Sequence, residues 1–250
     1  NFLIFQSGAT LRDNLRQGVA DLIVFEKSVA KLDLTGDGVS DIDPARINFV
    51  GLSLGGIVGG PYVAYAGKTA TAVLSASGGV FTQLLLDSAT LGPRVVAAIG
   101  APSTYSAGGV NYPLGYNLAA GSTQFNNLIR DLQTAVDSGD PINHIAAAQA
   151  AVPTLLQRVN GDTIVPNSAT NRLIAAGPFK KITAVGPTPV GKGSGGYIAM
   201  TAGAHPSLFD PQYSLAATVE MQTQAVKFAA SAVQPGGPFA GITSPAVVEK

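Results

Sequence analysis

The residues best suited to chemistry in this sequence are a serine between glycines and two histidines. The segment Gly51-Leu52-Ser53-Leu54-Gly55 has the G-x-S-x-G pattern, after an apolar run and before a run of small residues. That context predicts a sharp strand-to-helix turn that holds Ser53 in a strained conformation with its hydroxyl exposed. The flanking glycines are expected because side chains there would collide with neighbouring backbone. The pattern therefore favours a nucleophilic serine over an incidental serine in a glycine-rich turn.

The same turn predicts one group for binding an oxyanion. Leu54 would be the first residue of the helix, so its backbone N–H would face the developing negative charge on a substrate carbonyl oxygen. The sequence does not identify a second donor.

A serine hydroxyl needs a base, and the scarcity of histidine narrows the choice to two residues. His205 lies in a loop after the last predicted strand and before the last predicted helix, whereas His144 lies in a polar middle segment. In the chain order Ser, acid, His of this type of triad, the histidine follows the final strand. We therefore predict His205 as the base and a local hydrogen-bonding role for His144.

The acid that orients the histidine should leave the strand before the last one. Asp162 lies in the loop that follows the apolar run 152–159. Asp140 and Asp210 are competitors, and each precedes a proline. Asp140 is typical of a turn or helix start, so Asp162 is the predicted acid.

The elements that must position these residues follow from hydrophobic periodicity. The expected strands are 47–50, 71–76, 152–158 and 180–185, and the expected helices are 11–31, 54–66, 124–137, 168–176 and 215–230. The first helix is expected to begin with a capping box at Thr10 and Asp13. A glycine-rich loop is expected over 186–197, and an irregular tail from Gln234.

Strands that alternate with helices indicate an α/β fold with a mostly parallel sheet flanked by helices. We expect a single domain over 1–250, with an inserted cap or lid over about 88–150, where loops rich in Gly, Pro, Tyr and Asn break the alternation.

Composition excludes several classes of protein. The chain has 250 residues, 15 basic and 15 acidic residues, and no cysteine. A neutral chain without a basic run argues against a nucleic-acid binder, which needs a cationic face for the phosphates, and the absence of cysteine excludes disulfides and thiolate sites. No apolar stretch approaches the roughly 20 residues of a membrane span. The N-terminus lacks the features of a signal peptide.

The acidic loop over 33–43 is a candidate calcium-binding site. Asp33, Thr35, Asp37, Gly38 and Asp41 match the ligand and turn positions of an EF-hand-like loop. Position 12 of the pattern is Pro44 rather than a bidentate acid, with Asp43 beside it. A structural calcium in the 33–43 loop and a solvated acidic turn both remain open, and no other cofactor is expected.

The order and spacing of Ser53, Asp162 and His205 resemble those of the α/β-hydrolase superfamily over about 10–232. Three stretches, 12–17 (RDNLRQ), 41–56 (DIDPARINFVGLSLGG) and 137–143 (DSGDPIN), resemble bacterial extracellular lipases of the Pla-1/cef, or virulence-factor lipase, type. The resemblance implies hydrolysis of a carboxylic ester by a Ser-His-Asp triad, and an extracellular location as a secreted or cell-surface bacterial protein.

The chain departs from the family in the position of its nucleophile. In this fold the nucleophile usually follows the fifth strand, whereas here one helix and one strand precede Ser53. We therefore expect the chain to be a C-terminal portion of the fold that lacks its first strands and the loop with the second oxyanion donor. Weak activity and an exposed sheet edge are the expected consequences.

The substrate is expected to be a small-molecule or lipid ester, with the 88–150 segment covering the site. Two alternatives remain open. One is another hydrolase on the same triad, such as a polyester depolymerase, an amidase or a peptidase. The other is a non-catalytic surface or binding module. The sequence does not indicate chain-length preference or oligomeric state.

Overall fold

The computed structural model describes residues 3–4 and 7–250 of the chain. Within this part a five-stranded parallel sheet forms the centre, in the order β1-β2-β5-β8-β6. Its strands are β1 (Asn48–Leu52), β2 (Thr71–Ser75), β5 (Thr154–Val159), β6 (Phe179–Lys181) and β8 (Gly195–Met200). Two antiparallel ribbons pair β3 (Thr104–Ala107) with β4 (Val110–Pro113) and β7 (Gly186–Pro189) with β9 (Phe239–Ile242).

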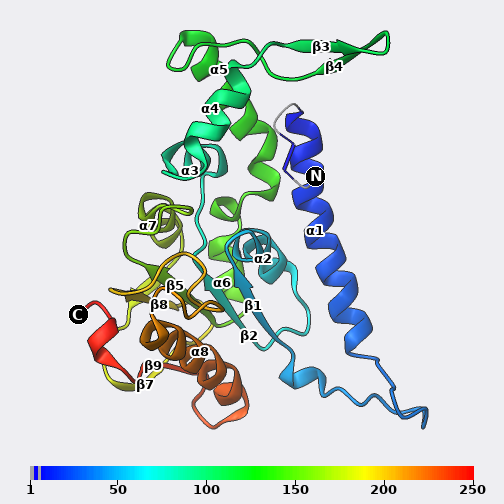
Figure 1. Ribbon diagram of the computed structural model, residues 1–250. Helices are drawn as coiled ribbons and strands as arrows, with labels where there is room; N and C mark the ends of the chain where they lie inside the picture. Colours follow the sequence, from blue (N-terminus) through cyan, green and yellow to red (C-terminus); the bar gives the residue numbers. More distant parts are fainter. Residues whose placement is uncertain (1–2, 5–6) are drawn as a thin grey trace.

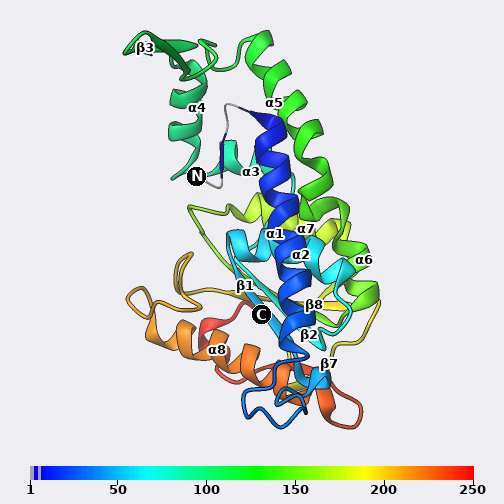
Figure 2. The same cartoon turned by 90° about the vertical axis from the view of Figure 1, so that its right-hand side faces the viewer.

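Helices cover both faces of the sheet. The α-helices are α1 (Gly8–Val29), α2 (Leu54–Tyr65), α3 (Phe81–Asp87), α4 (Gly92–Gly100), α5 (Thr123–Val136), α6 (Ile145–Ala151), α7 (Asn167–Ala176) and α8 (Leu215–Ala230). Short 3₁₀ turns are η1 (Pro44–Arg46), η2 (Asp137–Gly139), η3 (Pro141–Asn143), η4 (Ser231–Val233) and η5 (Pro245–Val247). Figure 2 shows the sheet between α8 on one side and α1, α2 and α6 on the other. The predicted α/β class with a parallel sheet is confirmed.

Successive residues of the central strands feed two separate cores, because side chains alternate between the faces of a sheet. On β2, Leu74 packs into the cluster beneath α1 and α2, whereas Val73 packs into the cluster beneath α8. On β5, Leu156 and Leu155 divide in the same way. All four side chains are buried, which explains why adjacent residues at the centre of each strand are apolar instead of alternating with polar residues.

The segment that was expected to form a cap divides into two parts. The β3–β4 ribbon and the neighbouring ends of α4 and α5 lie far from the sheet (Figure 1), and every residue of β3 is exposed. By contrast, α6 packs against α2 in the layer that covers the sheet. The domain boundaries and the covering role of 88–150 stay predictions.

The start of α1 differs from the predicted capping box. The N-cap is Ser7, whose Oγ accepts the N–H of Thr10 at 3.1 Å. Thr10 lies inside the first turn, and Asp13 instead pairs with Arg12 at 2.8 Å. The prediction was wrong by one turn because a second hydroxyl residue stands three positions earlier.

The strand predicted over 180–185 and the loop predicted over 186–197 also differ from the structure. The strand expected over 180–185 is the short edge strand β6, and part of the expected loop 186–197 is β8, which lies between β5 and β6. The two glycines at the start of β8 allow neighbouring side chains to pack closely against the strand, and they do not form a turn. A Cβ at Gly195 would lie 2.4 Å from Gln149 Nε2, and one at Gly196 would lie 2.5 Å from Ile182 Cδ1.

The tail from Gln234 is ordered rather than irregular. Its strand β9 pairs with β7, and the carboxylate of Glu220 on α8 accepts the N–H groups of Thr243 at 2.9 Å and Ser244 at 2.8 Å. Burial raises the pKa of Glu220, but hydrogen bonds from Thr243, Gln224 and Ser244 outweigh it and leave the pKa below its ordinary value. A buried carboxylate on α8 therefore ties down the tail.

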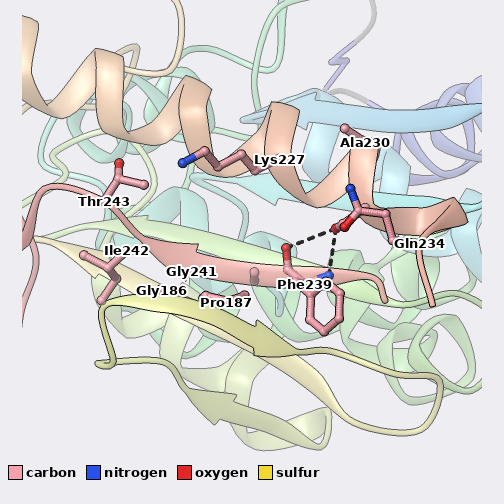
Figure 3. A pocket seen from close by; sticks show the side chains of 11 residues that line it. Gly186, Pro187, Lys227, Ala230, Gln234, Phe239, Gly241, Ile242 and Thr243 are labelled. Carbon is pink, nitrogen blue, oxygen red and sulfur yellow. Dashed lines mark hydrogen bonds between the residues drawn. The ribbon is translucent and has the colours of Figure 1, made fainter. Parts of the chain in front are cut away.

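A cavity of about 300 Å³ lies between α8 and the β7–β9 ribbon. Figure 3 shows Lys227 on the helix side and Phe239 and Ile242 on the ribbon side. Backbone groups of Phe239 bond to Ser231 at 2.8 and 3.3 Å and close one end. None of the predicted catalytic residues lines this cavity.

Candidate active site

Ser53 occupies the sharp turn that the sequence predicts. It lies between the last residue of β1 and the first residue of α2, with φ 57° and ψ −121°. A non-glycine residue at positive φ stores strain and persists only where its surroundings hold it. Here the Ser53 N–H donates to the Ser75 carbonyl of β2 at 2.9 Å. The neighbouring strand therefore fixes the backbone of the predicted nucleophile.

The glycines around Ser53 have different roles. A Cβ at Gly51 would lie 2.5 Å from the carbonyl oxygen of Gly55, which is backbone and cannot move aside cheaply. A Cβ at Gly55 would meet nothing within 4 Å, whereas one at Gly56 would lie 2.8 Å from Ser77 Cβ. The expectation that both flanking glycines avoid collisions is right for Gly51 and wrong for Gly55. The adjacent Gly56 is the second position where space is short.

Leu54 is the first residue of α2. The first N–H groups of a helix have no intrahelical acceptor, and the helix N-terminus carries partial positive charge. This position suits the predicted role of the Leu54 N–H as an oxyanion donor, which stays a prediction. No residue is assigned as the second donor.

His205 and Asp162 are in direct contact. His205 Nδ1 lies 2.7 Å from Asp162 Oδ2, and their side chains are 10% and 1% exposed. The other carboxylate oxygen of Asp162 accepts the N–H groups of Ile164 at 2.8 Å and Val165 at 3.0 Å. The carboxylate is thus held by its own loop and presents one oxygen to the imidazole, which fixes the proton on Nδ1 and leaves Nε2 as the basic nitrogen.

A tight turn sets the position of His205. Gly203 has φ +100°, a conformation open to glycine, and a Cβ there would lie 2.7 Å from Ser207 Oγ. Ser207 is fully buried, and its Oγ accepts the Ala204 N–H at 2.8 Å. Sequence reasoning missed Ser207, although a serine two residues after the predicted base in a Gly-Ala-His-Pro segment was the available signal.

The three predicted residues follow the carboxyl ends of parallel strands of one sheet. Ser53 follows β1, Asp162 follows β5 and His205 follows β8. Carboxyl ends of parallel strands meet at one edge, where α/β folds place their sites. Asp162 and His205 are brought together, while contact between Ser53 and His205 stays a prediction. The fold is an α/β fold with a parallel central sheet.

The competing acids are engaged elsewhere. Asp140 is fully buried and accepts the N–H groups of Phe81 at 2.6 Å and Ile142 at 3.0 Å, so it joins α3 to η3. Asp210 accepts the Gln212 N–H at 3.0 Å in a surface turn. Asp140 therefore has the turn role that its sequence context suggested.

His144 lies in local contacts, as expected. Its Nδ1 lies 3.3 Å from Tyr65 Oη and its Nε2 lies 3.2 Å from the Ser138 carbonyl. A carbonyl only accepts, so Nε2 carries the proton in the neutral ring and Nδ1 accepts from Tyr65. These bonds hold the 138–144 turn against α2.

The carboxylates of the acidic loop 33–43 accept hydrogen bonds from the backbone N–H groups of the same loop. Asp33 accepts the N–H groups of Gly36 at 2.6 Å and Gly38 at 2.8 Å, and these bonds lower its pKa. Asp41 accepts the N–H groups of Leu34 and Thr35 at 2.5 and 3.0 Å. Asp37 accepts the Val39 N–H at 2.8 Å. Among the described residues no group of three or more His, Asp or Glu side chains is arranged to hold a metal. A structural calcium in the 33–43 loop stays a prediction.

Comparisons with known proteins give fold-level likeness only. No protein-family model matches the sequence, and no curated protein matches it. Among solved structures, puromycin hydrolase is 14% identical with a TM-score of 0.48, over 92% of this chain and 28% of that chain. DcsB, in complex with its substrate analogue, is 13% identical with a TM-score of 0.45, over 89% of this chain and 73% of that chain. The monoacylglycerol lipase of Paleococcus ferrophilus is 13% identical with a TM-score of 0.42, over 84% and 74% of the two chains.

This chain spans less than a third of puromycin hydrolase. Similarities of this size carry no argument about substrate or activity. In the described part of the chain, no helix has the length and apolar character to cross a bilayer.

Proposed function

We propose that this chain hydrolyses carboxylic esters with Ser53 as nucleophile, His205 as general base and Asp162 as the orienting acid. The observation that supports it most is the buried 2.7 Å contact between Asp162 and His205, on loops that follow two strands of the sheet that also carries Ser53. The superfamily resemblance of the sequence supplies the reaction class.

In the proposed reaction, Nε2 of His205 takes the proton from the Ser53 hydroxyl as its oxygen attacks the ester carbonyl. Negative charge on the carbonyl oxygen is stabilised by the Leu54 N–H. The imidazolium, held by Asp162, then protonates the leaving alcohol, and an acyl group remains on Ser53. Water, deprotonated by the same histidine, attacks this ester and releases the acid.

More specifically, we propose that the chain is an extracellular esterase of the lipase type. This proposal rests on the three stretches that resemble bacterial extracellular lipases. Apolar surface near Ser53 suits an uncharged acyl group, since Leu52 and Leu54 flank the serine and are only partly buried.

The test combines active-site labelling with turnover. The chain is treated with a fluorophosphonate and assayed with p-nitrophenyl esters of several acyl lengths. Labelling that disappears in Ser53→Ala, with turnover lost in His205→Ala and kept in His144→Ala, is expected. A chain that neither takes the label nor turns over any ester would sink the proposal.

A further inference from the structure

Strand β9 has one edge against β7 and the other toward α8. The Pro238 carbonyl, just before β9, accepts the Val190 N–H at 3.0 Å, so the even-numbered residues of this stretch bond to the β7 side. Backbone groups alternate sides along an antiparallel strand. Phe239, Gly241 and Thr243 therefore direct their N–H and C=O groups toward α8.

Two of these three outward positions are bonded to buried side chains. The Phe239 N–H donates to Ser231 Oγ at 2.8 Å, and the Thr243 N–H donates to the Glu220 carboxylate at 2.9 Å. Gly241 lies between them. In the described part of the chain, no hydrogen bond from outside the β7–β9 ribbon reaches its N–H or its C=O. A single residue of this edge thus offers one donor and one acceptor.

The cavity of about 300 Å³ lies between α8 and this position of β9. Figure 3 shows Lys227 extending from α8 on the side of β9 that faces the helix. Among the described residues that line the cavity, Lys227 alone is charged, and it forms no ion pair with a described residue. Pro187, Phe239 and Ile242 supply apolar walls. The cavity therefore combines one cation with the backbone groups of Gly241 and an apolar lining.

An amino acid whose nitrogen is acylated matches this set of groups. In an antiparallel pair, two facing residues exchange both of their N–H···O bonds. The amide N–H of such a ligand donates to the Gly241 carbonyl, and one carboxylate oxygen accepts the Gly241 N–H. The other carboxylate oxygen accepts from the Lys227 ammonium in a charge-assisted hydrogen bond. A simple carboxylate has no N–H group, so the Gly241 carbonyl would stay without a partner.

We propose that the cavity between α8 and β9 binds an N-acyl amino acid with an apolar side chain. The C-terminal residue of a peptide carries the same groups. Because Phe239 and Thr243 are already bonded, only Gly241 can pair, and a longer chain gains no further backbone bond to β9. The site is separate from the predicted catalytic residues, none of which lines the cavity.

The test follows the backbone amide signals of the full chain by nuclear magnetic resonance during a titration at neutral pH. The probe is N-acetyl-L-leucine. Two relatives each lack one feature, since N-acetyl-L-leucine amide has no carboxylate and 4-methylpentanoate has no amide N–H. We expect the probe to shift the Gly241 signal saturably, with a dissociation constant of about 1 mM for a ligand of this size. Both relatives are expected to bind at least tenfold more weakly.

Variants of α8 test the cation and the cavity separately. Lys227→Met removes the ammonium, and Ala230→Leu fills part of the cavity while Lys227 stays. Each is expected to weaken binding of the probe at least tenfold, and Lys31→Met, at an exposed lysine that follows α1, is expected to leave it unchanged. All three positions are exposed, so we expect the fold to persist. Should Ala230→Leu fail to fold, as judged by circular dichroism, Lys227→Met decides alone.

The absence of a saturable shift at Gly241 would overturn the proposal, as would equal affinity for the probe and either relative, or equal affinity in Lys227→Met. A peptide arm uses acetyl-Ala-Ala-Leu with a free C-terminus, which is expected to bind no more tightly than the probe. Tighter binding of this peptide would overturn the proposal in favour of a peptide C-terminus. Ser53→Ala is expected to bind the probe like the wild type, so the outcome is independent of the proposed esterase activity.

Discussion

Asp162 holds His205 with one carboxylate oxygen while its other oxygen is held by the N–H groups of Ile164 and Val165. The acid therefore cannot rotate without breaking two backbone hydrogen bonds. An amide at this position could keep those two bonds but would present an N–H group to the imidazole, or lose them and accept from it. Either choice disturbs the orientation of the base.

For Asp162→Asn we expect kcat for p-nitrophenyl esters to fall by about 10⁴-fold, because the imidazole would carry its proton on the wrong nitrogen. The control is Asp210→Asn, since the Asp210 carboxylate accepts the Gln212 N–H within a surface turn. Unchanged turnover in Asp162→Asn would show that this carboxylate does not support the base.

Replacing each histidine in turn distinguishes a catalytic role from a structural one. His205→Ala should lower turnover by at least about 10³-fold through loss of general base catalysis. His144→Ala should keep turnover, because it removes only the bonds to Tyr65 and to the Ser138 carbonyl. Comparable losses of turnover in both folded variants would contradict the assignment of the base.

The glycines at the turn give a stability prediction. Gly51→Ala should lower the free energy of unfolding by about 1–3 kcal/mol, because the added methyl meets the backbone of Gly55. Gly55→Ala should be neutral or stabilising by up to about 1 kcal/mol, because its Cβ has open space on a helix. Urea denaturation measures both. A larger loss of stability in Gly55→Ala than in Gly51→Ala would contradict this geometry.

Glu26 gives a prediction on pH dependence. It is 2% exposed and accepts the N–H groups of Gly67 and Lys68 at 3.0 and 2.9 Å and the Thr69 hydroxyl at 2.8 Å. Burial raises the pKa of Glu26, but the hydrogen bonds from Thr69, Gly67 and Lys68 outweigh it, so the pKa lies below its ordinary value of 4.5.

A lowered pKa in the folded state means that Glu26 stabilises the fold fully above the unfolded pKa, and that this stabilisation is lost as pH falls through the folded pKa. Glu26→Gln should therefore cost about 1.5–3 kcal/mol at neutral pH, with a difference from wild type that shrinks below about pH 4.5. Asp21→Asn, on the exposed side of the same helix, should change stability by less than about 0.5 kcal/mol. A pH-independent difference would contradict this role.

The helices α1, α2, α5, α7 and α8 and the strands β1, β2 and β5 were predictable because their patterns are local, whereas the helices α3, α4 and α6 were not predicted. The closing helix matches α8 at both ends, and Thr71–Ser75 lies within the predicted strand 71–76. Strand β8 was not predictable in this way, because its glycines have the composition of a loop. Their reason, the crowding of Gln149 and Ile182 against Gly195 and Gly196, exists only once α6 and the strand are packed together.

The sequence by itself predicted Ser53 as the nucleophile, its strand-to-helix setting, and His205 rather than His144 as the base. Composition and chain order carry that information. Only the tertiary structure decided that Asp162 contacts His205 while Asp140 supports η3, and that Gly56 rather than Gly55 is crowded. Each of these depends on contacts between segments far apart in the chain, which periodicity along one segment does not record.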